Sequence, residues 1–198
     1  MGVLSPDNPD LKRLLGRLPS GLREHADRVR EEALKLARIH QVDTTRVEVA
    51  ALSHDLARGM KGTELLERAR SYGLELHPAE QRVTVLLHGP VGAEMLRREC
   101  GIEDQEVLEA VRWHSTFHRE LGPVAKVVFL ADKLDHQKRA RYPFLDRVDA
   151  LARDDLDAAV LAFLDEELVA LIRDGKPVHP ASIEGRNGLL ESQRVGKG

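Results

Sequence analysis

The dipeptide His54-Asp55 places an imidazole and a carboxylate side by side at the end of an alanine-rich, helix-patterned segment. Both side chains are metal ligands, and on adjacent helical positions they can approach one ion from neighbouring directions. Such a pair occurs by chance in many chains, so it indicates a metal site only together with other candidate ligands. His25 lies on the amphipathic segment before it, and Asp132 directly follows the apolar run Phe129-Leu130-Ala131. Because an unpaired carboxylate buried there would be costly, we expect a metal or a firm hydrogen-bond partner beside Asp132.

Two further histidines, His88 and His114, extend this set. Any one histidine is more often structural than ligating, but their order on separate helical segments favours a metal site. A single ion with an open coordination position needs fewer ligands than this set offers, so the set predicts two ions with Asp55 as the bridging carboxylate. The six candidate ligands are His25, His54, Asp55, His88, His114 and Asp132. Mixed nitrogen and oxygen ligands suit iron or manganese, with zinc also possible. Two such ions can share a hydroxide and stabilise charge during displacement at phosphorus.

The remaining histidines are interpreted as structural; they are His40, His77, His118, His136 and His179.

Helices are predicted to position these ligands. Apolar residues recur at three- and four-residue steps, and Asp43 and Asp104 stand where an N-cap is expected. The expected helices are 21–40, 44–57, 63–71, 79–87, 91–99, 104–113, one that opens at Gly122-Pro123 and runs through Leu134, and a long one that begins after Asp154 or Asp155 and closes at Gly175. Residues 83–87 are the only stretch whose β-branched composition favours a strand.

The composition is that of one ordinary globular domain. The aromatic content is only 4%, so the core is expected to be Leu, Val and Ala, which suits an all-α helical bundle. We divide the chain into an N-terminal extension (1–17), a catalytic domain (18–176) and a tail (177–198). The tail is expected to be partly extended and then disordered at its Gly/Lys-rich end.

The charge balance bears on partners and location. A formal net charge of −3 argues against a nucleic-acid-binding surface. No signal peptide or run long enough to span a bilayer is evident. The single cysteine, Cys100, excludes an intrachain disulfide and is compatible with the cytoplasm, where we expect the protein. The apolar helices would permit a homodimer without requiring one.

The segments around the candidate ligands carry extended motifs. They are Arg23-Glu24-His25, Ala50-Ala51-Leu52-Ser53-His54-Asp55-Leu56-Ala57, Leu87-His88-Gly89-Pro90-Val91-Gly92-Ala93, Ala110-Val111-Arg112-Trp113-His114-Ser115-Thr116, Phe129-Leu130-Ala131-Asp132-Lys133-Leu134-Asp135 and the tail segment His179-Pro180-Ala181-Ser182-Ile183-Glu184-Gly185-Arg186-Asn187. In these motifs the chain resembles the YqeK-type HD-domain proteins, which are symmetrical bis(5'-nucleosyl)-tetraphosphatases, over roughly residues 18–190.

The resemblance implies a single HD-domain helical bundle with a di-iron centre on those six ligands. It also implies hydrolysis of a small-molecule nucleotide, diadenosine tetraphosphate, into two molecules of ADP. Two alternatives stay open. The chain could be an HD-domain phosphohydrolase of another nucleotide or of a nucleotide monophosphate, or a nucleotide-sensing metal-binding module with little turnover.

Candidate substrate contacts flank the ligands. Arg58 lies one helical turn from His54-Asp55 and is the best candidate for a catalytic cation that grips phosphate through two donors. The other candidates are Ser115, Thr116, Lys133 and Arg139.

Three departures from the family pattern bear on substrate preference. Arg58 replaces the usual lysine, and Phe117 replaces the glycine of His-Thr-Thr-Gly. We expect Phe117 to lie at the pocket rim. Phe117 and Trp113 are the candidates for stacking on a base, although the core is the preferred place for Trp113. Asp135-His136-Gln137-Lys138-Arg139 replaces Glu-Pro-x-Arg with a shorter acid.

Overall fold

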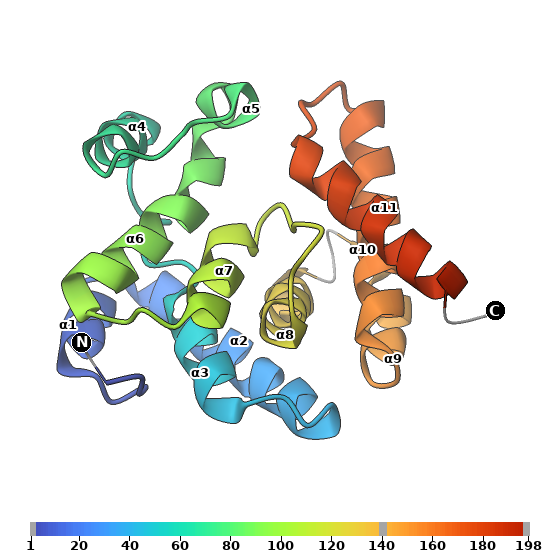
Figure 1. Cartoon of the computed structure of the whole chain (residues 1–198), viewed down its shortest axis with the longest axis horizontal. Helices are drawn as coiled ribbons and strands as arrows, with labels where there is room; N and C mark the ends of the chain where they lie inside the picture. Colours follow the sequence, from blue (N-terminus) through green and yellow to red (C-terminus); the bar gives the residue numbers. More distant parts are fainter. Residues whose placement is uncertain (1–2, 139–141, 196–198) are drawn as a thin grey trace.

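The computed structural model describes residues 3–138 and 142–195, and within these ranges every regular element is a helix (Figure 1). The α-helices are α1 (Pro9–Gly16), α2 (Ser20–Ile39), α3 (Thr44–Ser53), α4 (Gly62–Ser71), α5 (Pro78–Arg82), α6 (His88–Cys100), α7 (Gln105–Trp113), α8 (Pro123–Lys133), α9 (Leu145–Ala152), α10 (Leu156–Arg173) and α11 (Pro180–Val195). Two short 3₁₀ helices are η1 (Thr84–Leu87) and η2 (His136–Lys138). The predicted all-α fold class is confirmed.

Side-chain caps explain where several helices begin. Asn8, Asp43, Asp104 and Asp155 each accept a hydrogen bond from backbone N–H groups in the first turn of α1, α3, α7 and α10. Each cap satisfies a donor that the helix itself leaves unpaired. Of the two residues that we considered for the start of the last long helix, Asp155 is therefore the cap.

Helix α8 forms the centre of the core. All its residues except Pro123 and Lys126 are buried, as expected for a helix that other elements cover all round. It contacts α2, α3, α7 and α10. In Figure 1, α7 lies on one side of α8 and the pair α10 and α11 on the other, with α4, α5 and α6 beyond α7. Four of the helices that carry or precede candidate ligands, α2, α3, α7 and α8, thus pack together, and the fifth, α6, packs against α7.

Helix α1 falls within the residues that we treated as an extension. Leu11 and Leu14 are buried in the same core as α8, and α1 packs against α6. The domain boundaries themselves stay a prediction. Within the described ranges, no helix is both long enough and apolar enough to cross a membrane.

The backbone differs from the sequence expectations in several places. The helix expected over 79–87 is α5 followed by the 3₁₀ helix η1, so the strand that the composition of 83–87 would also allow does not form. Helix α6, expected from 91, begins at His88 with Gly89-Pro90 inside its first turn. The tail, expected to be partly extended, forms α11 from Pro180, and its Gly185 and Gly188 let this helix pack closely against residues 117–119. His179 Nδ1 accepts the Ala181 N–H at the start of α11, and Ser182 Oγ donates to the buried Thr116 carbonyl over 2.6 Å. The disorder expected at the chain end concerns 196–198, which lie outside the described residues.

Candidate metal centre

The six candidate ligands converge from five helices. His25 lies on α2, His54-Asp55 follow α3, His88 begins α6, His114 follows α7 and Asp132 lies on α8. All except His25 are buried, and the side chain of His25 is only 12% exposed. Five of them form two groups of three that could each hold a metal ion, and Asp55 belongs to both groups. Asp132 lies beside the first group, with Oδ1 3.7 Å from His54 Nε2.

The first group surrounds Asp55 Oδ2. His25 Nε2 lies 3.1 Å from Asp132 Oδ1 and 3.3 Å from His54 Nε2. Asp55 Oδ2 lies 3.6 Å from His54 Nε2 and 3.8 Å from His25 Nε2. Two imidazoles and two carboxylates therefore point at one volume.

The second group surrounds Asp55 Oδ1. This oxygen lies 3.1 Å from His88 Nε2 and 3.6 Å from His114 Nε2, and the two Nε2 atoms are 2.8 Å apart. Ser115 Oγ lies 3.3 Å from His88 Nε2 and 3.2 Å from His114 Nε2. Asp55 thus directs one oxygen to each group, as a bridging carboxylate would.

Backbone carbonyls set the tautomers of three imidazoles. Nδ1 of His54 donates to Ala51 O over 2.7 Å, Nδ1 of His114 donates to Val111 O over 2.7 Å, and Nδ1 of His88 donates to Val85 O. With the hydrogen on Nδ1, each neutral ring presents the lone pair of Nε2 to the centre. The Nε2 lone pairs then face one another and the carboxylate oxygens. A cation shared between these atoms would satisfy them. The donor set therefore fits metal ions.

A glycine allows the second group to assemble. A Cβ added at Gly89 would lie 2.4 Å from the carbonyl oxygen of Arg112, so only glycine lets α6 approach α7 this closely. That approach brings His88 next to His114.

The electrostatics of His54, His114 and Asp55 favour the protonation states that bind metal. Burial lowers the pKa of His54, and it lowers that of His114 to about 4, so both are neutral near pH 7. Burial alone would raise the pKa of Asp55, but His54, His114 and His88 outweigh it and hold that pKa far below its usual value. Neutral imidazoles and ionised carboxylates are the forms that bind metal.

The candidate substrate contacts have different surroundings. Arg58 is exposed, and its backbone N–H donates to the Asp55 carbonyl over 3.0 Å; Ser115 lines the second group. Thr116 is buried, and its carbonyl accepts from Ser182. Lys133 is also buried, with Nζ 2.9 Å from Asp132 Oδ2 and 3.1 Å from His114 O. Its ammonium thus ties the two ligand groups together. Arg139 lies outside the described residues.

Phe117 does not lie at a pocket rim. Its side chain is 1% exposed and packs edge-on against Phe129 in the core, so it cannot stack on a base. Its φ is +65°, in the left-handed region that favours glycine. The backbone there keeps the glycine-like turn, and the added ring is accommodated by the core rather than by the site.

Sequence reasoning missed the residues that hold the ligands in place. Asp135 Oδ2 lies 2.7 Å from His25 Nδ1, and Arg28 donates to both oxygens of Asp135. Lys138 Nζ lies 2.5 Å from Asp132 Oδ1. The only sequence signal for this network was the acid at 135 soon after the last ligand helix.

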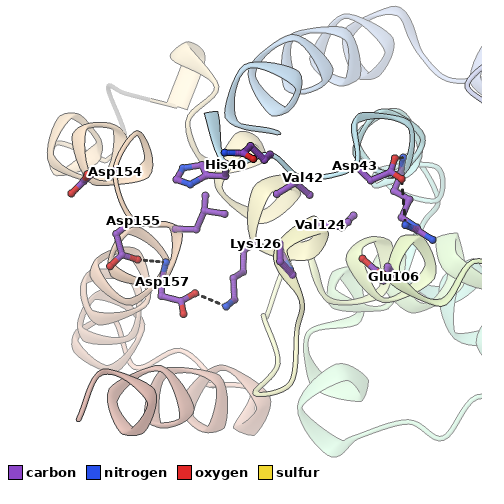
Figure 2. Close-up of a pocket in the computed structure, with 13 residues that line it drawn as sticks. His40, Val42, Asp43, Glu106, Val124, Lys126, Asp154, Asp155 and Asp157 are labelled. Atoms are coloured by element: carbon purple, nitrogen blue, oxygen red, sulfur yellow. Dashed lines mark hydrogen bonds and ion pairs between the residues drawn. The ribbon is translucent and has the colours of Figure 1, made fainter. Parts of the chain in front are cut away.

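A broad surface pocket lies elsewhere (Figure 2). It is lined by His40, Asp43, Lys126, Asp155 and Asp157, among others, and by none of the candidate ligands. His40 is fifteen positions after His25 along α2, about 22 Å away at ~1.5 Å per residue. Asp43 and Asp155 cap helices, and Asp157 pairs with Lys126 over 2.5 Å, so its polar side chains already serve the fold.

The chain is similar to known proteins in sequence and in fold. The HD domain family model matches residues 22–137. The chain is 31% identical to a symmetrical bis(5'-nucleosyl)-tetraphosphatase of Halalkalibacterium halodurans over 86% of this chain and 90% of that protein. It is 30% identical to the protein of the same name from Staphylococcus aureus, over 86% of this chain and 88% of that protein. A crystal structure from Clostridium acetobutylicum, described as a predicted HD superfamily hydrolase involved in NAD metabolism, superposes with a TM-score of 0.87 at 28% identity. It covers 93% of this chain and 96% of that one.

Proposed function

This chain belongs to the HD-domain family and, within it, to the symmetrical bis(5'-nucleosyl)-tetraphosphatases, and we propose that it hydrolyses diadenosine tetraphosphate to two molecules of ADP. The observation that carries the proposal is the position of Asp55 between two groups of ligand atoms. We further propose that His25, His54, Asp55 and Asp132 hold one ion and that His88, His114 and Asp55 hold the other, with iron as the native metal.

The bound ions would supply Lewis acidity at phosphorus and make water a nucleophile near neutral pH. The protein supplies the rest. Arg58 is exposed three positions after Asp55 and can donate two hydrogen bonds to phosphate oxygens. Ser115 Oγ, beside His88 and His114, can donate a further hydrogen bond on the other side. Attack at a central phosphorus then releases ADP as the leaving group and leaves a second ADP that has gained the water oxygen.

The cationic residues considered as phosphate contacts differ in their surroundings. Arg58 can turn to a substrate, and Arg139 stays a candidate from the sequence alone. Lys133 is proposed to act on the ligands rather than on phosphate, because its Nζ already contacts Asp132 and His114. A cytoplasmic location and a homodimer also stay proposals.

Product analysis tests the proposed reaction. The purified protein, supplied in turn with Fe²⁺ and Mn²⁺, should convert diadenosine tetraphosphate into ADP alone. In ¹⁸O-labelled water, half of the ADP should carry one label, because water enters only one of the two products. Formation of AMP with ATP would contradict the symmetrical cleavage. Turnover confined to another nucleotide would favour an HD-domain phosphohydrolase of different specificity. Full metal occupancy without turnover would favour a nucleotide sensor.

A further inference from the structure

Among the four candidate histidine ligands, only His25 has a side chain as the partner of its Nδ1. Nδ1 of His54, His88 and His114 faces a backbone carbonyl, but Nδ1 of His25 lies 2.7 Å from Asp135 Oδ2. A carboxylate at this position fixes the tautomer and ring direction, and it makes the imidazole a stronger base toward metal than a carbonyl does. The side chain of Asp135 is only 2% exposed, so water does not compete for it.

Arg28 holds this carboxylate in turn. Its Nε lies 3.0 Å from Asp135 Oδ1, and its Nη2 lies 2.9 Å from Asp135 Oδ2. Three positions after His25 on α2, Arg28 lies on the same face of the helix, so both can reach one carboxylate on the segment after α8. The two-pronged bond fixes the carboxylate's orientation as well as its charge.

Asp135 therefore lies buried between a guanidinium and the His25 ring. It places a carboxylate beside the first group without occupying a ligand position.

We propose that Arg28 and Asp135 are positioning residues that orient His25 and set the metal affinity of the first group, leaving the second group unaffected. The inference rests on the proposed function to the extent that the ligand groups take divalent ions. It assigns Arg28 and Asp135 to one of the two ion sites, since neither forms a hydrogen bond or ion pair with His88 or His114.

The test is a two-site titration of the full chain with Mn²⁺ and, separately, with Co²⁺, whose visible absorption reports coordination. In Asp135→Asn the amide oxygen can still accept from Nδ1, but the charge is lost. We expect one of the two dissociation constants to rise roughly 10–100-fold and the other to stay at the wild-type value. Asp135→Glu, which restores the charge, should recover part of the lost affinity. An effect on general stability would not produce this one-site pattern or the rescue.

Arg28→Met provides a second route should Asp135→Asn fail to fold, because the Arg28 side chain is 23% exposed and Asp135 stays in place. It should weaken the same site, by less than Asp135→Asn does. The matched control is Arg30→Met on the same helix, which breaks the 2.5 Å ion pair of Arg30 with Glu48 and should leave both constants unchanged. If both Asp135→Asn and Arg28→Met kept the wild-type dissociation constants, this inference would be overturned and the proposed function would stand. A wild-type chain that takes up neither ion would overturn the metal-dependent function, and this inference with it.

Discussion

Asp55 differs from the other candidate ligands because it belongs to both groups. Asp55→Ala should therefore remove both ions and lower turnover by more than ~10³-fold, on the scale of losing a central catalytic group. His88→Ala removes a ligand of the second group only, so the first should still take up metal. Elemental analysis together with turnover checks both variants. Asp7→Ala, at an exposed carboxylate, is the control. Metal content near wild type in Asp55→Ala would contradict the bridging role.

Residue type determined which residues of the site could be predicted from the sequence. Metal ligation admits few side chains, so the histidines and aspartates stood out in the sequence. The supporting charges did not, because lysine, arginine and aspartate are common on surfaces and their pairing spans long sequence distances. Arg28 and Asp135 are 107 positions apart. For the same reason Lys133 was read as a phosphate contact, although it is buried against Asp132.

Cys100 offers a residue-scale test of the core. It is 3% exposed, and burial raises the pKa of its thiol to about 11. Because the thiolate is the reactive form, the native protein at pH 8 should react with a thiol reagent roughly 10²-fold more slowly than the unfolded chain. Labelling in buffer and in denaturant, followed by absorbance, measures the ratio. Equal rates would place Cys100 outside a stable core.

At the scale of elements, most helices were predictable because caps and apolar periodicity are local signals. Helix α3 was expected to continue to 57 but ends at Ser53, and the chain then turns to present His54 and Asp55. Helix α9 was not predicted, and α11 was expected to be extended. Helix α11 carries glycines at 185 and 188 that disfavour a helix locally, so it depends on packing against the segment 116–119.

That packing predicts a specific sensitivity at Gly185. A Cβ there would lie 2.7 Å from the ring of the buried Phe117 and 3.4 Å from the backbone of His118, so neither neighbour can yield easily. Gly185→Ala should destabilise the protein by about 1–3 kcal/mol and lower the Tm by roughly 3–10 °C, although alanine is the better helix former. Thermal unfolding measures the change. Gly16→Ala, whose added Cβ would meet nothing within 4 Å, should shift the Tm little. A Tm for Gly185→Ala at or above wild type would mean that α11 does not pack as described.

At the scale of the whole molecule, the metal centre joins parts of the chain that are far apart in sequence. The ligands run from His25 on α2 to Asp132 on α8, and Lys133 adds a link between Asp132 and the end of α7. Bound ions would therefore cross-link most of the helical core. Since the unfolded chain cannot hold these ligands together, the ions bind the folded state preferentially.

Metal removal should consequently lower global stability, beyond its effect at the site. At a metal concentration 100 times the dissociation constant, one site adds about 2.7 kcal/mol to the free energy of unfolding. For a chain of this size, that raises the Tm by roughly 5–11 °C. Thermal unfolding with added Mn²⁺ and after chelation measures the difference. Asp55→Ala serves as the control and should unfold at one temperature in both conditions. A wild-type Tm that chelation leaves unchanged would mean that the six side chains converge without binding metal strongly enough to matter to the fold.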